Sequence, residues 1–280
     1  MTVLVTGATG RVGRGVVAEL LRAGVRVRAL TRRPESAGLP EGAEVVRGDL
    51  ENPESLAEAL KGVERMYLFP VAETAREVVA MARRAGVRRI VVLSGALAEE
   101  EADDEEGGYR AVEVAVQESG LEWTLARPSE FAANWLDYAA DIRDKREVRR
   151  PFGEAVTRPT HEADIALVAA RALVEEGHAG QIYVLAGPEA LTVAEQVRLI
   201  GEAIGEEVRF VELTPEQARA EWYDPEQGVD HEVIDWLLDL YGTSAGGSGR
   251  VPGSDTFERL TGRPPTSFAR WAADHAHDFR

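Results

Sequence analysis

The chain has 280 residues, a hydrophobic fraction of 44% and a formal net charge of −17. This length and composition allow a sizeable core, in one large domain or two small ones. The lack of cysteine excludes disulfides, thiolate nucleophiles and cysteine-ligated metals, and the negative charge argues against nucleic acid as a partner, because phosphate binding needs clustered lysine and arginine.

The first predicted element is an apolar strand, residues 2–5, that enters a glycine-rich turn and leaves it as an amphipathic helix over residues 14–23. In this setting Gly7 permits a tight turn, Gly10 lets a diphosphate approach the backbone, and Gly13 lets helix and strand pack closely. The free N–H groups and the positive helix end would hold the phosphates. We therefore predict a dinucleotide site formed by Gly7, Thr9, Gly10, Arg11, Val12 and Gly13.

The second predicted strand, residues 25–30, leads to two arginines, Arg32 and Arg33. Proteins that prefer NAD usually carry an acidic residue here for the ribose hydroxyls, whereas the 2′-phosphate of NADP calls for arginine. No acidic residue lies at positions 29–31. The sequence thus favours NADP (NADPH) over NAD, with Arg32 on the 2′-phosphate; the alternative is a pair of solvated arginines.

Further strands are predicted at residues 44–50, 65–70 and 89–95, separated by helices over 53–60 and 73–85. Such alternation indicates βαβ units and an α/β, Rossmann-type, doubly wound parallel sheet, which binds ligands beyond the carboxyl ends of its strands. Three of these ends supply candidate site residues. Asp49 would accept from the adenine amino group or cap the next helix, and Phe69 with Pro70 would lie beside the nicotinamide.

The fifth strand ends at Ser94, which is a candidate catalytic residue or simply a turn or cap residue. An acidic run at residues 99–106 follows, which we expect to be a solvated, mobile loop, with a metal or cationic-partner site as the alternative. A helix over 109–119 and a sixth strand over 122–128 come next. The segment after that strand should reach the cofactor rim, and its predicted substrate-pocket residues are Phe131, Asn134 and Trp135.

We assign residues 1–150 to the NAD(P)-binding Rossmann domain and residues 151–280 to a smaller C-terminal α/β substrate-cleft portion, interleaved with the sheet in a single structural unit. Within the C-terminal portion, Thr192 with Glu195 forms a predicted capping box. Residues 243–249 are typical of a hinge-like loop. The spacing of the histidines predicts no metal site.

Several segments spread over nearly the whole chain carry a family resemblance. They are the turn at residues 6–13, Arg32, residues 118–128, Phe131 with Asn134, and residues 162–166, 183–188 and 260–268. Together they resemble the NmrA-like atypical short-chain dehydrogenases. The resemblance implies a Rossmann domain that binds NADP or NAD, and its members include quinone and azo-compound reductases and redox sensors that do not turn the cofactor over.

Ordinary short-chain dehydrogenases use a tyrosine with a lysine four residues later, because the lysine lowers the pKa of the phenol. This chain has Tyr109 followed by Glu113, and a carboxylate would oppose ionisation of that phenol. The pair looks like a variant of the His-x-x-x-Glu pattern of quinone-reductase-like members. Tyr109 and Ser94 are nevertheless the catalytic candidates.

We therefore predict an NAD(P)H-dependent oxidoreductase that transfers a hydride to a quinone-like or unsaturated small molecule without a Tyr–Lys pair. The alternatives are a non-catalytic NADP(H)-binding redox sensor and a non-redox biosynthetic enzyme on the same fold. A small-molecule substrate is the expected partner, and a homodimer is left open. No stretch approaches the ~20 apolar residues that span a bilayer and no signal-peptide pattern is present, so we expect a cytoplasmic protein without membrane contact.

Overall fold

The computed structural model describes residues 1–98, 108–225, 228–245, 247 and 249–280. The acidic run at 99–106 lies outside these residues. The chain divides into two compact units that are not continuous in sequence. Unit 1 contains Met1–Pro128, Glu162–Leu185 and Thr256–Arg263, and unit 2 contains Ser129–His161, Ala186–Asp255 and Pro264–Arg280. The expected boundary at residues 150 and 151 falls inside the first segment of unit 2.

Unit 1 is built on one sheet of seven parallel strands in the order β3-β2-β1-β4-β5-β6-β9. The strands are β1 (Thr2–Val5), β2 (Arg26–Thr31), β3 (Glu44–Arg47), β4 (Arg65–Leu68), β5 (Arg89–Leu93), β6 (Glu122–Pro128) and β9 (Gln181–Leu185). The order reverses between β1 and β4, so a topological switch point lies there. The predicted α/β, doubly wound fold is confirmed.

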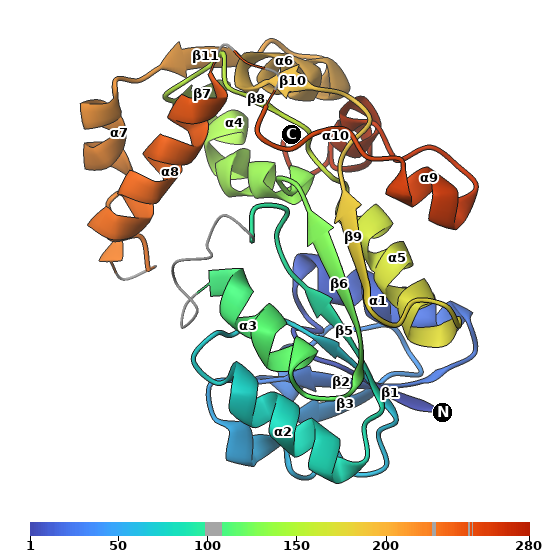
Figure 1. Cartoon of the computed structure of the whole chain (residues 1–280). Helices are drawn as coiled ribbons and strands as arrows, with labels where there is room; N and C mark the ends of the chain where they lie inside the picture. Colours follow the sequence, from blue (N-terminus) through green and yellow to red (C-terminus); the bar gives the residue numbers. More distant parts are fainter. Residues whose placement is uncertain (99–107, 226–227, 246, 248) are drawn as a thin grey trace. The chain divides into compact units, whose positions relative to one another are not determined.

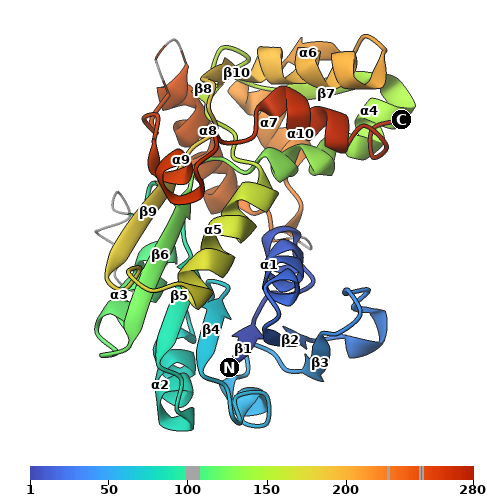
Figure 2. The ribbon, with the colours of Figure 1, turned by 90° about the vertical axis from the view of Figure 1, so that its right-hand side faces the viewer.

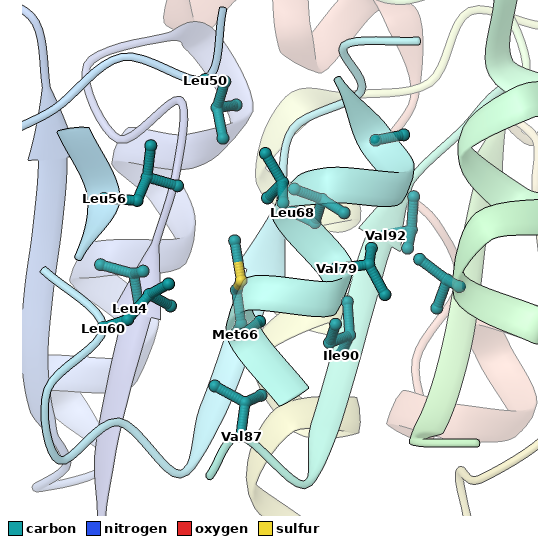
Figure 3. Packing of buried hydrophobic residues seen from close by; sticks show 14 of the residues in the cluster. Leu4, Leu50, Leu56, Leu60, Met66, Leu68, Val79, Val87, Ile90 and Val92 are labelled. Atoms are coloured by element: carbon teal, nitrogen blue, oxygen red, sulfur yellow. The ribbon is translucent and has the colours of Figure 1, made fainter. Parts of the chain in front are cut away.

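Helices cover both faces of this sheet. Helices α1 (Arg11–Arg22) and α5 (Glu162–Val174) pack together on one face, and α2 (Ala75–Ala85) and α3 (Gly108–Gln117) pack together on the other (Figures 1 and 2). Short α9 (Thr256–Thr261) packs against α5 and β9. Figure 3 shows the core beneath α2, where alternate strand residues point to one side: Leu4, Met66, Leu68, Ile90 and Val92.

Two arginines at the amino-terminal edge of the sheet hold the end of α5. Arg89, which is 2% exposed, donates to the carbonyls of Ala172 at 3.3 Å and Glu175 at 2.5 Å. Arg65 donates to the carbonyl of Leu173. These bonds satisfy carbonyls that a helix terminus leaves free and place cations at its negative end. They tie α5 to unit 1 although 33 residues of unit 2 precede it in the chain.

Unit 2 has its own core of aromatic and aliphatic side chains, centred on Trp271, Phe268, Trp135 and Ile200. Its strands pair as β7 (Glu147–Arg150) with β11 (Arg209–Glu212), in parallel, and β8 (Val156–Thr157) with β10 (Leu191–Thr192), antiparallel. Its helical elements are η3 (Ala132–Tyr138), α4 (Ala139–Lys145), α6 (Val193–Ile204), α7 (Pro215–Trp222), α8 (His231–Ser244) and α10 (Phe268–Asp274).

Local hydrogen bonds explain where the elements differ from expectation. The helix expected at 53–60 is only a 3₁₀ helix, η2 (Pro53–Leu56), and Ser55 donates to the carbonyl of Asn52 at 2.6 Å instead of continuing a regular helix. The prediction of a hinge-like loop over residues 243–249 is wrong at Thr243 and Ser244, because both lie in α8. The capping box at Thr192 is confirmed. No helix in the described part of the chain is long and apolar enough to cross a membrane.

Candidate dinucleotide-binding site

The turn after β1 is packed most tightly at Gly7 and Gly13. Gly7 has a φ of +57°, in the left-handed region. A Cβ atom on Gly13 would lie 2.1 Å from the carbonyl oxygen of Gly7, and one on Gly10 would lie 3.2 Å from the same oxygen. The Gly10 N–H donates to that oxygen at 2.9 Å. The turn is therefore a bare backbone cradle of the shape that a dinucleotide diphosphate requires.

Helix α1 begins directly at this turn with Gly10 as its N-cap, so no side chain occupies the free N–H groups. Its first turn carries no acidic residue, and Thr9, Gly10 and Arg11 are exposed. Val12 is buried in the hydrophobic core. The positive end of α1 is thus open to an anion.

Thr6 joins the ends of β1 and β4 at the switch point. Its hydroxyl donates to the carbonyl of Tyr67 at 3.0 Å and accepts the N–H of Phe69 at 2.8 Å. Phe69 is 42% exposed, and a Cβ atom on Gly7 would lie 2.9 Å from the Cβ of Phe69. Phe69 and the half-buried Pro70 therefore lie beside the glycine turn, where ligands of such sheets bind.

Arg32 follows β2 and is exposed. Among the described residues, the guanidinium groups of Arg32 and Arg33 have neither an ion pair nor a hydrogen bond. Arg47, from β3, behaves differently: it donates to the carbonyl of Arg32 at 3.0 Å and pairs with Glu35 at 3.2 Å. The two arginines after β2 are therefore the ones available to a phosphate.

Asp49 closes a local turn. Its Oδ1 accepts the N–H of Glu51 at 3.1 Å, and its own N–H donates to Ser55 Oγ at 2.9 Å. This contact closes the turn before η2, and the alternative interpretation of Asp49 as the cap of the next helix is wrong. The N-cap of η2 is Asn52, three residues further on. Contact of Asp49 with adenine stays a prediction.

Ser94 belongs to a buried polar cluster at the ends of β5 and β6. Its hydroxyl donates to Oε1 of Glu113 at 2.6 Å. Arg127 donates to the same carboxylate through Nε and Nη2, both at 2.7 Å. Ser94 and Glu113 are fully buried, so the serine proton is directed at an ion pair. Sequence reasoning missed Arg127 as a partner, although an arginine in a buried apolar strand signals an internal carboxylate.

Two tyrosines lie near this edge of the sheet. The ring of Tyr109 covers the backbone after β5, since a Cβ atom on Gly95 would lie 2.9 Å from it. Tyr67, on β4, is 1% exposed, and its hydroxyl has no hydrogen-bond partner among the described residues. Burial raises the pKa of Tyr67 far above its usual value, and Tyr109 raises it further. Sequence reasoning overlooked this buried phenol because β4 has the pattern of an ordinary core strand.

The three predicted pocket residues belong to unit 2 and differ in exposure: Phe131 is half-buried, Asn134 is exposed and Trp135 is 2% exposed. Trp135 Nε1 donates to Oε1 of Gln196 at 2.7 Å. Trp135 therefore packs in the core of unit 2 in this structure.

A buried arginine lies against that tryptophan. The guanidinium of Arg150 lies 5.2 Å from the ring centroid of Trp135, 5.5 Å from that of Tyr138 and 4.4 Å from that of Tyr241. Tyr241 in turn donates to Glu130 at 2.7 Å. Cation–π contacts and a nearby carboxylate thus compensate the buried charge.

In the parts of the chain that the structure describes, no group of three or more acidic or histidine side chains could hold a metal ion.

Comparisons with known proteins agree with this geometry. The family model described as NAD(P)H-binding matches residues 7–176. A (4-alkanoyl-5-oxo-2,5-dihydrofuran-3-yl)methyl phosphate reductase of Streptomyces griseus is 39% identical, with 99% of each chain covered. An NAD(P)H azoreductase of Xenophilus azovorans is 34% identical, again over 99% of each chain. The crystal structure of the Escherichia coli NADPH-dependent quinone oxidoreductase QOR2 complexed with NADPH has a TM-score of 0.79 and 26% identity, covering 98% of this chain and 99% of that one.

Proposed function

Since the chain belongs to the NAD(P)H-binding family, among the NmrA-like atypical short-chain dehydrogenases and reductases, we propose that this NAD(P)H-dependent reductase uses NADPH to reduce a quinone-like or unsaturated small molecule. The observation that carries the choice of NADPH is Arg32, which is exposed, unpaired among the described residues, and directly follows β2, the strand next to β1 in the sheet. A guanidinium is matched in charge and geometry to the 2′-phosphate.

Each part of the cofactor is assigned to a different group of residues. The turn from Gly7 to Gly13 and the amino terminus of α1 hold the diphosphate, Arg32 holds the 2′-phosphate, and Asp49 faces the adenine. Phe69 and Pro70 cover one side of the nicotinamide and keep water away from it. The bare backbone of the turn and the 42% exposure of Phe69 support this assignment.

The bound cofactor supplies the hydride. The chain's part is to hold the acceptor against the nicotinamide and to exclude water. Tyr109 is the proposed proton donor to the reduced acceptor, or else the proton comes from solvent, which an electron-poor acceptor allows. Ser94 is proposed to act through its bond to Glu113, which links the end of β5 to α3. No Tyr–Lys pair takes part in this scheme.

The substrate class follows from what such a mechanism can reduce. A hydride acceptor that needs no strong general acid is a quinone, an azo compound or a conjugated enone. Related proteins carry names of these kinds: an azoreductase, a quinone oxidoreductase and a reductase of an unsaturated furanone phosphate. The half-buried Phe131 and the exposed Asn134 are proposed to contact such a flat molecule.

Fluorescence titration of the purified protein with NADPH and with NADH tests the cofactor assignment, and NADPH consumption with a panel of quinones, azo dyes and enones tests the reaction. We expect tighter binding of NADPH and turnover with at least one acceptor. Binding without turnover of any acceptor supports a redox sensor and overturns the proposal. Conversion of a substrate without net NADPH oxidation overturns it in favour of a non-redox enzyme.

A further inference from the structure

Arg14 connects two segments that the proposed cofactor site needs at a set distance from each other. It is the fourth residue of α1, and its side chain is exposed. Nη2 donates to the carbonyl of Thr9 in the glycine turn at 3.3 Å. The same guanidinium donates to Gly38 at 2.5 Å and to Ala37 at 3.4 Å, both in the connection between β2 and β3.

The acceptor side of this contact is shaped for it. Gly38 has a φ of +54°, a left-handed conformation that turns its carbonyl in a direction few other residues reach without strain. A Cβ atom at Gly38 would find the Nη1 atom of Arg14 as its nearest neighbour, at 3.9 Å. The bond between Arg14 and Gly38 thus depends on the backbone at residue 38 as much as on the arginine.

The segment that Arg14 holds begins at Arg32. Its other end is secured from β3, where Arg47 donates to the carbonyl of Arg32 at 3.0 Å and pairs with Glu35 in the 3₁₀ helix η1 (Pro34–Ser36). Residues 32–38 are therefore held at both ends by arginines whose donors are used on protein atoms. Arg32 is the residue at the first of these attachments, through its carbonyl, and its guanidinium has no partner among the described residues.

We propose that Arg14 is a positioning residue for the choice of cofactor: it sets the spacing between the diphosphate turn and Arg32 without itself contacting the 2′-phosphate. The diphosphate and the 2′-phosphate are attached to one adenosine, so their separation in the cofactor is nearly constant. A protein that already has its two phosphate-binding groups at that separation loses less conformational entropy on binding. This inference rests on the proposed role of Arg32.

Substitution of Arg14 separates this role from a purely structural one. An exposed side chain that donates to surface carbonyls contributes little to folding, so Arg14→Gln should leave the melting temperature nearly unchanged. The dissociation constant for NADPH should rise about fivefold, the effect of losing about one net hydrogen bond. The dissociation constant for NADH and kcat at saturating NADPH should not change, since neither depends on the 2′-phosphate.

Two further variants sharpen the test. Gly38→Ala disfavours the left-handed backbone conformation that directs the residue 38 carbonyl toward Arg14. This variant should reproduce the loss of NADPH preference. Arg22→Gln is the matched control, because Arg22 is an exposed arginine at the far end of α1 that pairs with Glu19 instead of the cofactor loop. It should leave both dissociation constants at their original values.

A double-variant cycle with Arg32→Ala decides how Arg14 acts. If Arg14 works through the placement of Arg32, Arg14→Gln in the Arg32→Ala background should cause no further loss of NADPH preference. An additive loss would mean that Arg14 contacts the phosphate directly and would overturn the inference. If Arg32→Ala lowers the NADPH preference and Arg14→Gln leaves it unchanged, the inference about Arg14 is overturned while the proposed 2′-phosphate site stands. An Arg32→Ala without effect overturns both the inference and the proposed 2′-phosphate site.

Discussion

Glu113 and Arg127 form a bidentate ion pair inside unit 1, with Nε and Nη2 of the arginine each 2.7 Å from a different carboxylate oxygen. The two side chains are 0% and 5% exposed. The pair joins α3 to β6 and also accepts the hydroxyl proton of Ser94. Arg127 therefore compensates, at short range, the negative charge of Glu113 that we expected to oppose ionisation of Tyr109.

Breaking this pair from one side should be costly. Glu113→Gln leaves the Arg127 guanidinium buried without a counter-charge, and we expect a loss of about 3 to 5 kcal/mol in the free energy of unfolding. Denaturation in urea measures it. The double variant Glu113→Gln with Arg127→Met should recover part of that loss, because no buried charge remains. A double variant whose loss equals the sum of the two single losses would contradict the pairing.

Tyr67→Phe should have the opposite effect on stability. The variant keeps the ring and removes a buried hydroxyl that has no described partner, so we expect the protein to be unchanged or stabilised by about 1 kcal/mol. Loss of stability by more than that amount would show that the hydroxyl is bonded in solution.

The same residue predicts a pH dependence. Burial raises the pKa of Tyr67 in the folded protein above that of the unfolded chain. The folded state therefore holds this proton more tightly, and the stability that it contributes is present below the unfolded pKa of about 10 and is lost as the pH rises beyond it. Urea denaturation at pH 8 to 11 should show a smaller alkaline loss for Tyr67→Phe than for the parent protein.

The glycine turn gives two variants with different expected defects. In Gly13→Ala the new methyl group would lie 2.1 Å from the Gly7 carbonyl oxygen, which the backbone cannot accommodate without moving. We expect lower thermal stability together with loss of cofactor binding. In Gly10→Ala the corresponding distance is 3.2 Å and φ is −76°, which alanine adopts freely. Its melting temperature should change little while NADPH affinity falls. Equal melting temperatures for the two variants would contradict this account of the turn.

Arg32→Ala tests the phosphate assignment. Loss of one charge-assisted contact should weaken NADPH binding by about 1 to 3 kcal/mol and leave NADH binding nearly unchanged. Isothermal titration with both cofactors provides the ratio of dissociation constants. Arg33→Ala is the neighbouring control, and a larger effect there would move the assignment to Arg33.

Local backbone chemistry explains what the sequence could predict. The glycines at positions 7, 10 and 13 each answer a requirement of the turn itself, and the strand-helix alternation indicates the parallel sheet without any long-range information. The helix ends with capping residues, such as Thr192, were predictable for the same reason.

Contacts between distant segments account for what the sequence left hidden. The bonds of Arg127 to Glu113 and of Arg14 to Gly38 span 14 and 24 positions, and no local pattern specifies them. The sequence predicts Trp135 as a substrate-pocket residue, yet its indole N–H donates to Gln196 within the core of unit 2. The buried Arg89 bonds to the end of α5 through the backbone carbonyls of Ala172 and Glu175, which are partners that a sequence does not reveal.

The most direct test of the central claim follows the hydride itself. The protein is incubated with NADPH carrying deuterium at the transferred position of C4 and with a conjugated enone, and the product is analysed by mass spectrometry and NMR. Hydride transfer should form a carbon–deuterium bond at the β-carbon, place a solvent proton on the α-carbon and yield one NADP⁺ per product. Bound NADPH that keeps its deuterium with every enone, quinone and azo acceptor would contradict the account.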